Sequence, residues 1–448
     1  MPNQLQVTLS TKQILKIALP ISLALMVPQF NFIINNVFLG HLSEQALATA
    51  SITGVYYLIF AGIGFGLNNG LQALISRRAG ENRPEEIGKI FNLGVLISLL
   101  IATAGILITY FIAPVVLKAS IHSEQTYKMS VEFLRIRIWG LPFLYIYQMR
   151  NALLVGTNQS KYLVTGTLAE AVTNVLFDYT LIFGNWGLPA FGFNGAAIAS
   201  IISEFVGMFV IYLVISAKGI SRRFSLMKNI YWDTENAKGI LNISGPLIFQ
   251  SAISIISWIF FYILIEHHGE TNLAISNTMR NIFGFFGVFV WAFGATANSM
   301  VSNVIGQGKK NMVLHLIKKI MLLSMSIAVF VCILLNLFPA QYLSIYGQST
   351  EGFVRQGIPL LRLVSFVMVL MSAASVWLNS VTGTGNSRVT FFIELAAITF
   401  YCIYIYFVLE VYNLSIFWGW MSEIIYWSIM LFLSFAYMKS GKWRAKII

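Results

Sequence analysis

Residues 90–113 read IFNLGVLISLLIATAGILITYFIA, a run that contains no Asp, Glu, Lys or Arg. An α-helix rises about 1.5 Å per residue, so a run of this length crosses the roughly 30 Å hydrocarbon core of a bilayer. Comparable apolar runs recur along the whole chain. Each of them predicts one membrane-spanning helix.

The composition places the whole chain in the same class. Of its 448 residues 57% are hydrophobic and only 10% are charged, which is too little charge to cover the surface of a soluble protein. We expect an all-α membrane protein of about 12 transmembrane helices. The predicted spans are residues 14–38, 46–75, 89–117, 128–155, 161–183, 193–218, 240–265, 272–300, 314–338, 355–381, 388–411 and 413–438. No cleavable signal peptide is expected, because the first apolar run belongs to the first span.

The net charge of +12 is distributed unevenly between the loops on the two sides. One side carries most of the basic residues, among them Arg77, Arg78, Arg222, Arg223, Lys309, Lys310, Lys442 and Arg444; the other has about six, Lys118, Lys128, Arg135, Arg137, Arg355 and Arg362. The positive-inside rule then predicts a protein of the inner (cytoplasmic) membrane with both termini in the cytoplasm. This charge faces anionic lipid, and no nucleic-acid partner is expected.

A polar stretch from Ala217 to Lys238 lies at the midpoint and suggests an internal repeat. A shift of 227 residues brings Leu134-Arg135 onto Leu361-Arg362 and Gly156-Thr157 onto Gly383-Thr384. We expect two pseudo-symmetric six-helix lobes, with a cavity between them. The N-terminal lobe is predicted at residues 1–217, a cytoplasmic linker at 218–239, and the C-terminal lobe at 240–448.

Asp178 lies within an apolar span, where an ionised carboxylate costs at least about 2.5–3.5 kcal/mol. Asn174 precedes it by four residues, so both side chains project from one helical face. Their oxygens could bind a small cation or a proton; alternatively, the two could be a structural polar pair that bonds a neighbouring helix. Glu170 and Glu204 lie in the same region and could form a proton or polar relay, or could simply bond other helices.

In the second half, Gln250, Ser254 and Trp258 recur every four residues and form one stripe. An amide, a hydroxyl and an indole favour a substrate cavity over a lipid-facing surface, although Trp258 could equally be packing. Asn277 and Arg280 complete the candidate cavity. Glu266 is a further relay candidate and a possible ion-pair partner of Arg280, or else an interfacial loop residue. Glu394 and Glu423 are buried acids without an assigned role.

Several blocks resemble the multidrug and toxic compound extrusion (MATE) family of transporters. They are Phe38-Leu-Gly-His-Leu42, Asn174-Val-Leu-Phe-Asp178, Gly195-Ala-Ala-Ile-Ala199, Gly245-Pro246 and Gly306-Gln-Gly308. The resemblance covers nearly the whole chain. It implies two lobes with alternating access, antiport of organic compounds against Na⁺ or H⁺, no cofactor, and a monomer.

In relatives that this chain resembles, the sodium site includes an Asp at the position of Asn35, the backbone carbonyl at Ala196 and the hydroxyl position at Ser200. Asn35 can donate a carbonyl oxygen to a cation but cannot accept a coupling proton. We therefore favour Na⁺ bound by Asn35, Asn174, Asp178, Ala196 and Ser200. A proton carried by Asp178 alone is the alternative.

The predicted function is cation-coupled export of small amphipathic or cationic organic compounds. A lipid-linked saccharide flippase of a related fold is the alternative, although that class has a more cationic cavity. No enzyme is expected, since the chain has no HExxH, no GxSxG and no Walker loop. The expected partners are a small-molecule substrate and membrane lipid.

Overall fold

The structure is a computed structural model that describes residues 5–121, 123–228, 231–344 and 351–446. Nearly all of these residues are helical, and the described part of the chain contains no β-strand. The prediction of an all-α protein is confirmed. Residues 229 and 230 of the predicted linker lie outside the described residues.

Ten helices of the described chain are long and apolar enough to cross a membrane. The helix α7 (Leu163–Phe183) is not one of them, because Glu170, Asn174 and Asp178 lower its hydropathy. The predicted span 128–155 is also not one of them, because it consists of two shorter helices, α5 (Glu124–Arg137) and α6 (Leu141–Gly156), joined by the 3₁₀ turn η1 (Ile138–Gly140). These two segments and the ten long helices account for the expected number of spans.

The chain folds into two compact units. The unit called here the N-terminal unit is Leu23–Ile248, and the C-terminal unit is Met1–Ser22 with Phe249–Ile448. Two helices, α1 (Thr11–Leu42) and α10 (Thr234–Glu266), each contribute residues to both units. The lobe boundaries proposed from the sequence stay predictions.

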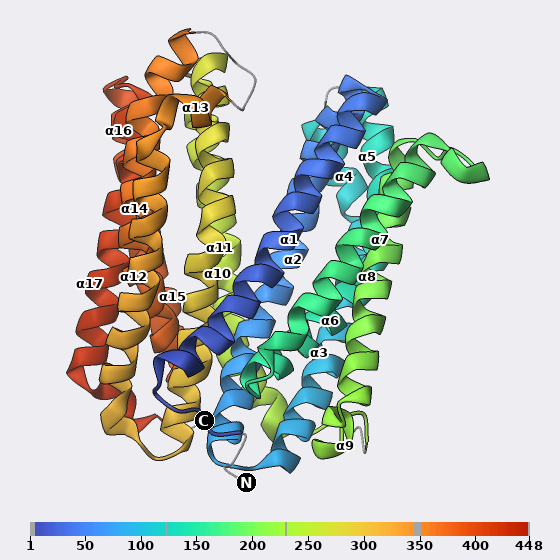
Figure 1. Ribbon diagram of the computed structural model, residues 1–448. Coiled ribbons are helices and arrows are strands. Elements are labelled where there is room, and N and C mark those ends of the chain that lie inside the picture. The colour runs from blue at the N-terminus through green and yellow to red at the C-terminus, as the bar shows by residue number, and fades with distance from the viewer. Residues whose placement is uncertain (1–4, 122, 229–230, 345–350, 447–448) are drawn as a thin grey trace. The chain divides into compact units, whose positions relative to one another are not determined.

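The N-terminal unit is built around pairs of neighbouring helices (Figure 1). Helix α6 packs against α2, α3 and α8, and α7 lies along α8. Tyr145 of α6 is fully buried and donates its hydroxyl to the Phe60 carbonyl at 2.8 Å. Besides α5, α6, α7 and η1, the unit contains α2 (Glu44–Gly80), α3 (Pro84–Phe111), α4 (Ala113–Ser120), η2 (Ser160–Tyr162), η3 (Asn185–Gly187), α8 (Phe193–Ala217) and α9 (Ile220–Arg223).

In the C-terminal unit, helix α14 is central and packs against α11, α12 and α17. Phe261 and Trp420 are fully buried in its core, with ring centroids 5.3 Å apart. The unit contains α11 (Glu270–Gly306), η4 (Lys310–Met312), α12 (Val313–Leu337), α13 (Pro339–Ser344), α14 (Glu351–Gly383), α15 (Ser387–Ile405), the π-helical turn η5 (Tyr406–Val411), α16 (Ile416–Trp420), α17 (Ser422–Ser440) and η6 (Lys442–Ala445).

Both ends of the described chain lie beside one loop of the C-terminal unit. Asn303, at the end of α11, accepts the Val7 amide at 3.0 Å and donates to the Leu5 carbonyl at 2.9 Å. Lys310 donates to the Arg444 carbonyl at 2.7 Å. The first and last described residues are therefore held at the same end of this unit, as an even number of spans requires.

Capping residues, proline and glycine mark where several of the helices begin and end. Ser43 accepts the Ala46 amide and begins α2, and Pro84 occupies the first turn of α3. Asp233 precedes α10 and accepts hydrogen bonds from the backbone and side chain of Asn236, which hold the pKa of its carboxyl below the usual value. Gly184 ends α7 with a left-handed φ of 74°.

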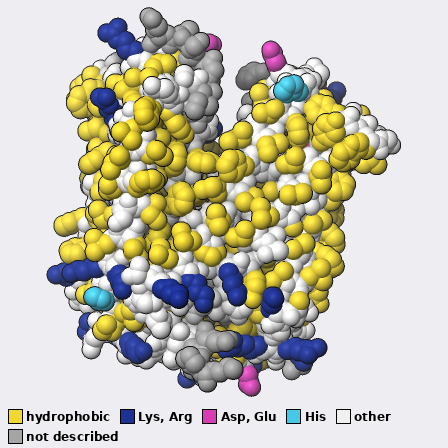
Figure 2. Space-filling model, in the orientation of Figure 1, with side chains coloured by type: hydrophobic (Ala, Val, Ile, Leu, Met, Phe, Trp, Pro, Cys, Tyr) yellow, Lys and Arg dark blue, Asp and Glu magenta, His cyan; other side chains and the backbone are white. Residues whose placement is uncertain are grey.

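The surface agrees with a membrane environment. Hydrophobic side chains cover the middle of the helices of each unit, and most of the visible Lys and Arg side chains gather toward one end of them (Figure 2). Phe111 and Val115 are 73% and 70% exposed, and many other large apolar residues are more than one-third exposed. Such continuous apolar cover is stable only against lipid.

Candidate cation site

The candidate site lies where α7 and α8 approach each other closely. A Cβ at Gly195 would overlap the Leu181 carbonyl, so only glycine permits this approach. Asp178 lies about one turn before Leu181 on α7, and Ala196 follows Gly195 on α8. The close approach therefore holds the Asp178 part of α7 against the first turns of α8.

Asp178 is fully buried, at 0% exposure. Neither of its carboxylate oxygens has a hydrogen-bond partner, and no ion pair within 4.0 Å in the described chain includes it. A buried charge without a partner is strongly unfavourable, so it must be neutralised by a proton or a bound cation. Asp178 is the group in this unit that most clearly needs a ligand.

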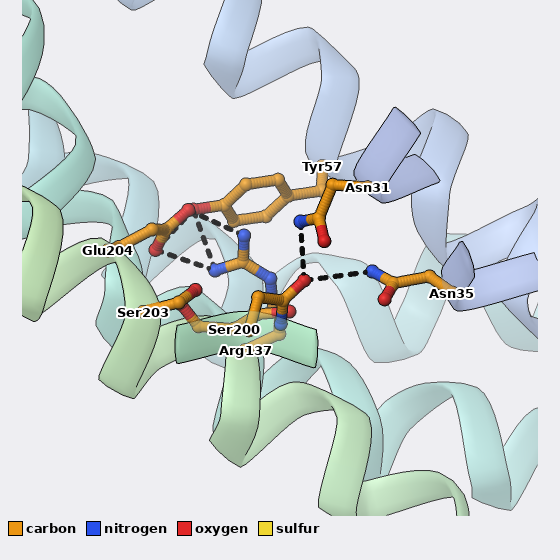
Figure 3. A network of polar contacts seen from close by, with 8 residues as sticks. Asn31, Asn35, Tyr57, Arg137, Ser200, Ser203 and Glu204 are labelled. Atoms are coloured by element: carbon orange, nitrogen blue, oxygen red, sulfur yellow. Dashed lines mark hydrogen bonds and ion pairs between the residues drawn. The ribbon is translucent and has the colours of Figure 1, made fainter. Parts of the chain in front are cut away.

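Three asparagines meet one helical turn from Asp178. The Asn174 carbonyl oxygen accepts hydrogen bonds from the amides of Asn31 at 2.6 Å and Asn35 at 3.1 Å (Figure 3). This arrangement leaves the Oδ1 atoms of Asn31 and Asn35 buried and without partners. Two unpaired carbonyl oxygens are therefore available in the cluster that contains Asn174.

The two predicted site residues of α8, Ala196 and Ser200, lie on one face of that helix. Ala196 is buried at 7% exposure, and Ser200 follows it by four residues. Ser203 donates its hydroxyl to the Ser200 carbonyl at 2.8 Å. Both residues are on the helix that packs against α7, but no direct contact between their oxygens and Asp178 is observed among the described interactions.

Next to this cluster, Glu204 forms an ion pair with Arg137. The Arg137 guanidinium contacts Glu204 Oε1 at 2.6 Å and Oε2 at 2.9 Å, and its carbon lies 3.8 Å from the centre of the Tyr57 ring. The Tyr57 hydroxyl bonds both partners (Figure 3). Arg137, expected among the outer-loop residues, has a side chain only 12% exposed. Its placement outside was wrong, because a partner of opposite charge stabilises the guanidinium in the interior.

Glu170 precedes Asn174 by four residues, so it lies about one helical turn from the cluster on the same face of α7. It packs against Gly207 of α8, where an added Cβ would come within 2.9 Å of the Glu170 Cβ. Among the described residues near α7 and α8, the acids Glu170, Asp178 and Glu204 lie close to the cation Arg137, which pairs with Glu204 alone.

Sequence reasoning missed Arg137, Asn31 and Tyr57. Two signals were available. Arg137 lies inside the predicted span 128–155, where an arginine needs a partner. Asn31 precedes Asn35 by four residues and so shares its helical face. The role of Tyr57 had no such signal, since aromatic residues are common in these spans.

In the C-terminal unit, the predicted stripe converges on an acid that had no assigned role. Glu394 of α15 is 2% exposed and accepts hydrogen bonds from Gln250 at 3.1 Å and Ser254 at 2.7 Å. The Tyr426 hydroxyl also donates to it. Gln250 and Ser254 therefore stabilise a buried carboxylate with neutral donors.

The other predicted cavity residues are arranged differently. Trp258 stacks on Tyr262 with ring centroids 6.0 Å apart, and the exposed Arg280 lies 5.1 Å above the same ring. Asn277 is partly buried, and Glu266 is exposed at the end of α10. The possible ion pair between Glu266 and Arg280 is not formed in the described chain, because Arg280 contacts the Tyr262 ring instead.

The cluster suits a monovalent cation better than a transition metal. No group of three His, Cys, Asp or Glu residues that could hold a metal ion occurs among the described residues. Besides the Asn174 Nδ2 donor, the unpaired atoms of the cluster are the Asp178 carboxylate and the amide oxygens of Asn31 and Asn35, which are hard ligands. One negative charge with neutral oxygens balances one monovalent cation or one proton.

The apolar surface, the multiple long helices and the charged residues in the interior define a multi-pass membrane protein. The chain belongs to the MatE family, whose profile matches residues 20–180 and again residues 246–407. The two matches begin 226 residues apart, which agrees with the repeat read from the sequence.

Curated relatives cover most of the chain at low identity. A probable multidrug resistance protein NorM of Thermotoga maritima is 23% identical over 98% of this chain and 94% of its own. A probable multidrug resistance protein YoeA of Bacillus subtilis is 22% identical over 68% of this chain and 66% of its own. The matched family and these relatives give no support to the flippase alternative.

Solved structures share the fold over the full length. A MATE protein in complex with MaL6 superposes with a TM-score of 0.90 at 16% identity, over 98% of this chain and 97% of that one. An outward-facing multidrug resistance MATE transporter also gives 0.90 at 16% identity, over 98% of both chains. At this identity the likeness establishes the fold, and the predicted two-lobe helical architecture is confirmed.

Proposed function

We propose that this chain is a cation-coupled antiporter that exports small amphipathic or cationic organic compounds by alternating access. The observation that carries the proposal is Asp178, a fully buried carboxylate whose two oxygens have no partner. The names of the relatives, multidrug resistance proteins, support organic compounds as the cargo.

The proposed cation site consists of Asn35, Asn174, Asp178, Ala196 and Ser200. Na⁺ is favoured because Asn35 can provide a neutral oxygen but cannot take a proton. The unpaired Oδ1 of Asn31 adds a sixth candidate ligand that the sequence did not reveal. Protonation of Asp178 would also remove the cost of the buried charge, so H⁺ is the competing ion.

The coupling between ion movement and substrate export follows from the energetic cost of the buried Asp178 charge. A bound cation neutralises Asp178, and its release leaves a buried charge that the protein must relieve by rearrangement. An ion that binds one access state more tightly than the other shifts the population between them. A gradient of that ion then drives the opposite movement of the organic substrate.

Substrate contacts are proposed for Gln250, Ser254, Trp258, Asn277 and Arg280. Trp258 is supported by its partly buried ring, which offers a face to aromatic or cationic compounds. The relay role of Glu204 is weakened by its ion pair with Arg137, whereas Glu170 has no such partner among the described ion pairs. Glu266 is an exposed candidate for the same proton or polar relay.

The proposed setting is the inner membrane, with both termini in the cytoplasm and lobes at residues 1–217 and 240–448. It is supported by the basic residues Lys309, Lys310 and Arg444 at the end where both termini lie. The protein is proposed to act as a monomer without a cofactor.

Efflux of a cationic dye from proteoliposomes tests the proposal, with sodium and pH gradients imposed separately. The variant Asp178→Asn should lose efflux under both gradients while inserting normally. Asp233→Asn is the matched control, because Asp233 is the chain's only other Asp and Asn can also cap a helix. Efflux driven by sodium alone supports Na⁺ coupling, and unchanged transport by Asp178→Asn would refute the site.

A further inference from the structure

An open groove runs along the surface of the C-terminal unit between α12 and α17. Its volume is about 600 Å³, and its walls are almost entirely apolar. Leu370 and Trp377 of α14 form its floor, Met321 of α12 one wall, and Leu431 and Phe432 of α17 the other. The groove belongs to one unit and is separate from the candidate cation site.

The order of residues along the helices gives the groove a direction. Lys318, Trp377 and Phe435 lie at one end, and Leu322 and Ser428 lie at the other. Seven residues separate Ser428 from Phe435 on α17, so the groove is roughly 10 Å long. Lys318, in the second turn of α12, lies toward the end of the unit that carries both chain termini.

Two ammonium groups stand at that end. Lys318 is exposed and lines the groove, and Lys439 lies 5.7 Å from the centre of the Phe435 ring. Neither lysine takes part in an ion pair among the described residues. The groove is therefore apolar along its length and positively charged at one end.

Contacts within the protein hold the floor of the groove in place. Trp377 is 2% exposed, its indole N–H contacts Met321 Sδ at 3.1 Å, and its ring packs edge-to-face on Phe435 at 4.9 Å. A rigid apolar floor needs little reorganisation to accept a chain-like ligand. Lysine stems can also lie on apolar surface while the ammonium reaches the lipid headgroups.

We propose that this groove is a binding site for one anionic phospholipid, with an acyl chain between α12 and α17 and the phosphate at Lys318 and Lys439. A groove that is apolar along its length and ends at two exposed lysines matches the acyl chain and the phosphate of one lipid molecule. The positive end selects an anionic headgroup.

Native mass spectrometry of delipidated protein tests the site with phosphatidylglycerol and phosphatidylcholine of identical chains. The protein should bind phosphatidylglycerol more tightly. K318Q should lower that affinity about fivefold, as expected for one lysine near a lipid surface, and lower the affinity for phosphatidylcholine, whose phosphate is balanced by its own choline cation, by less. K12Q removes an equivalent exposed charge from α1 and should have no effect. Equal affinity of the unaltered protein for both lipids would overturn the proposal.

The acyl chain needs a separate variant. S428F places a phenyl ring at the end of the groove that lies away from Lys318, and it should reduce binding of both lipids. Glycerophosphoglycerol, which has the headgroup but no acyl chains, should not compete with phosphatidylglycerol. If S428F is not monodisperse, L322F provides a second test, because it adds a phenyl ring at the same end of the groove from the opposite helix, α12. Lipid binding that survives groove filling overturns the proposal. The proposal is also overturned if the unaltered protein forms dimers that S428F or L322F abolishes, because such dimers assign the groove to a second copy of the chain.

Discussion

Arg137 and Glu204 meet at two points inside the N-terminal unit, with N–O distances of 2.6 and 2.9 Å. Arg137 is the last residue of α5, and Glu204 lies in the middle of α8. A Cβ at Gly140 would overlap both side chains, so only glycine leaves room for the pair. The pair neutralises Glu204, whereas Asp178 and Glu170 take part in no ion pair among the described residues.

Breaking this pair from one side should be costly. Arg137→Gln leaves the Glu204 carboxylate buried without a cation and should destabilise the folded protein by about 3–5 kcal/mol. The double variant with Glu204→Gln should recover most of that loss. Thermal unfolding in detergent measures both effects.

Arg135→Gln is the matched control, since Arg135 is exposed two residues earlier on the same helix. It should shift stability by less than about 0.5 kcal/mol. A double variant no more stable than Arg137→Gln would mean that the guanidinium is needed for other contacts, such as that with the Tyr57 ring.

Restoring an acid in the first span should change the ion dependence. Asn35→Asp places a second carboxylate beside Asn174, and two nearby acids favour sharing a proton. Efflux by this variant should respond more strongly to a pH gradient than efflux by the unaltered protein. Dye efflux at several external pH values measures the difference.

Asn36→Asp makes the same change one position along and should leave the pH response unaltered, because Asn36 points to a different helix face. An identical pH profile for Asn35→Asp and the unaltered protein would count against a coupling role for this position.

Asn303 should anchor the N-terminal residues. It is fully buried and bonds both the Leu5 carbonyl and the Val7 amide. Asn303→Ala removes both of these hydrogen bonds, and the loss should be about 1–3 kcal/mol. Limited proteolysis should then cleave near Lys12 faster than in the unaltered protein.

Asn311→Ala removes an exposed amide from the adjacent turn and serves as the control. Equal cleavage rates for both variants would show that contacts other than Asn303, such as that of Lys319 with the Leu9 carbonyl, hold the segment.

The sequence by itself determined the all-α membrane fold, the duplication and the prominence of Asp178. These depend on local properties: apolar runs of membrane length, a repeat offset, and the single Asp within a predicted span. Asn174 was also readable, because a spacing of four residues places two side chains on one face.

Only the tertiary structure decided which groups are neutralised and by what. Arg137 and Glu204 are 67 residues apart, and Glu394 accepts a hydrogen bond from Gln250, 144 residues away in sequence. Such pairings depend on how helices pack, and helical periodicity specifies a face without specifying the partner that covers it. For the same reason the unpaired oxygens of Asp178, Asn31 and Asn35 became visible only when every neighbouring donor had been placed.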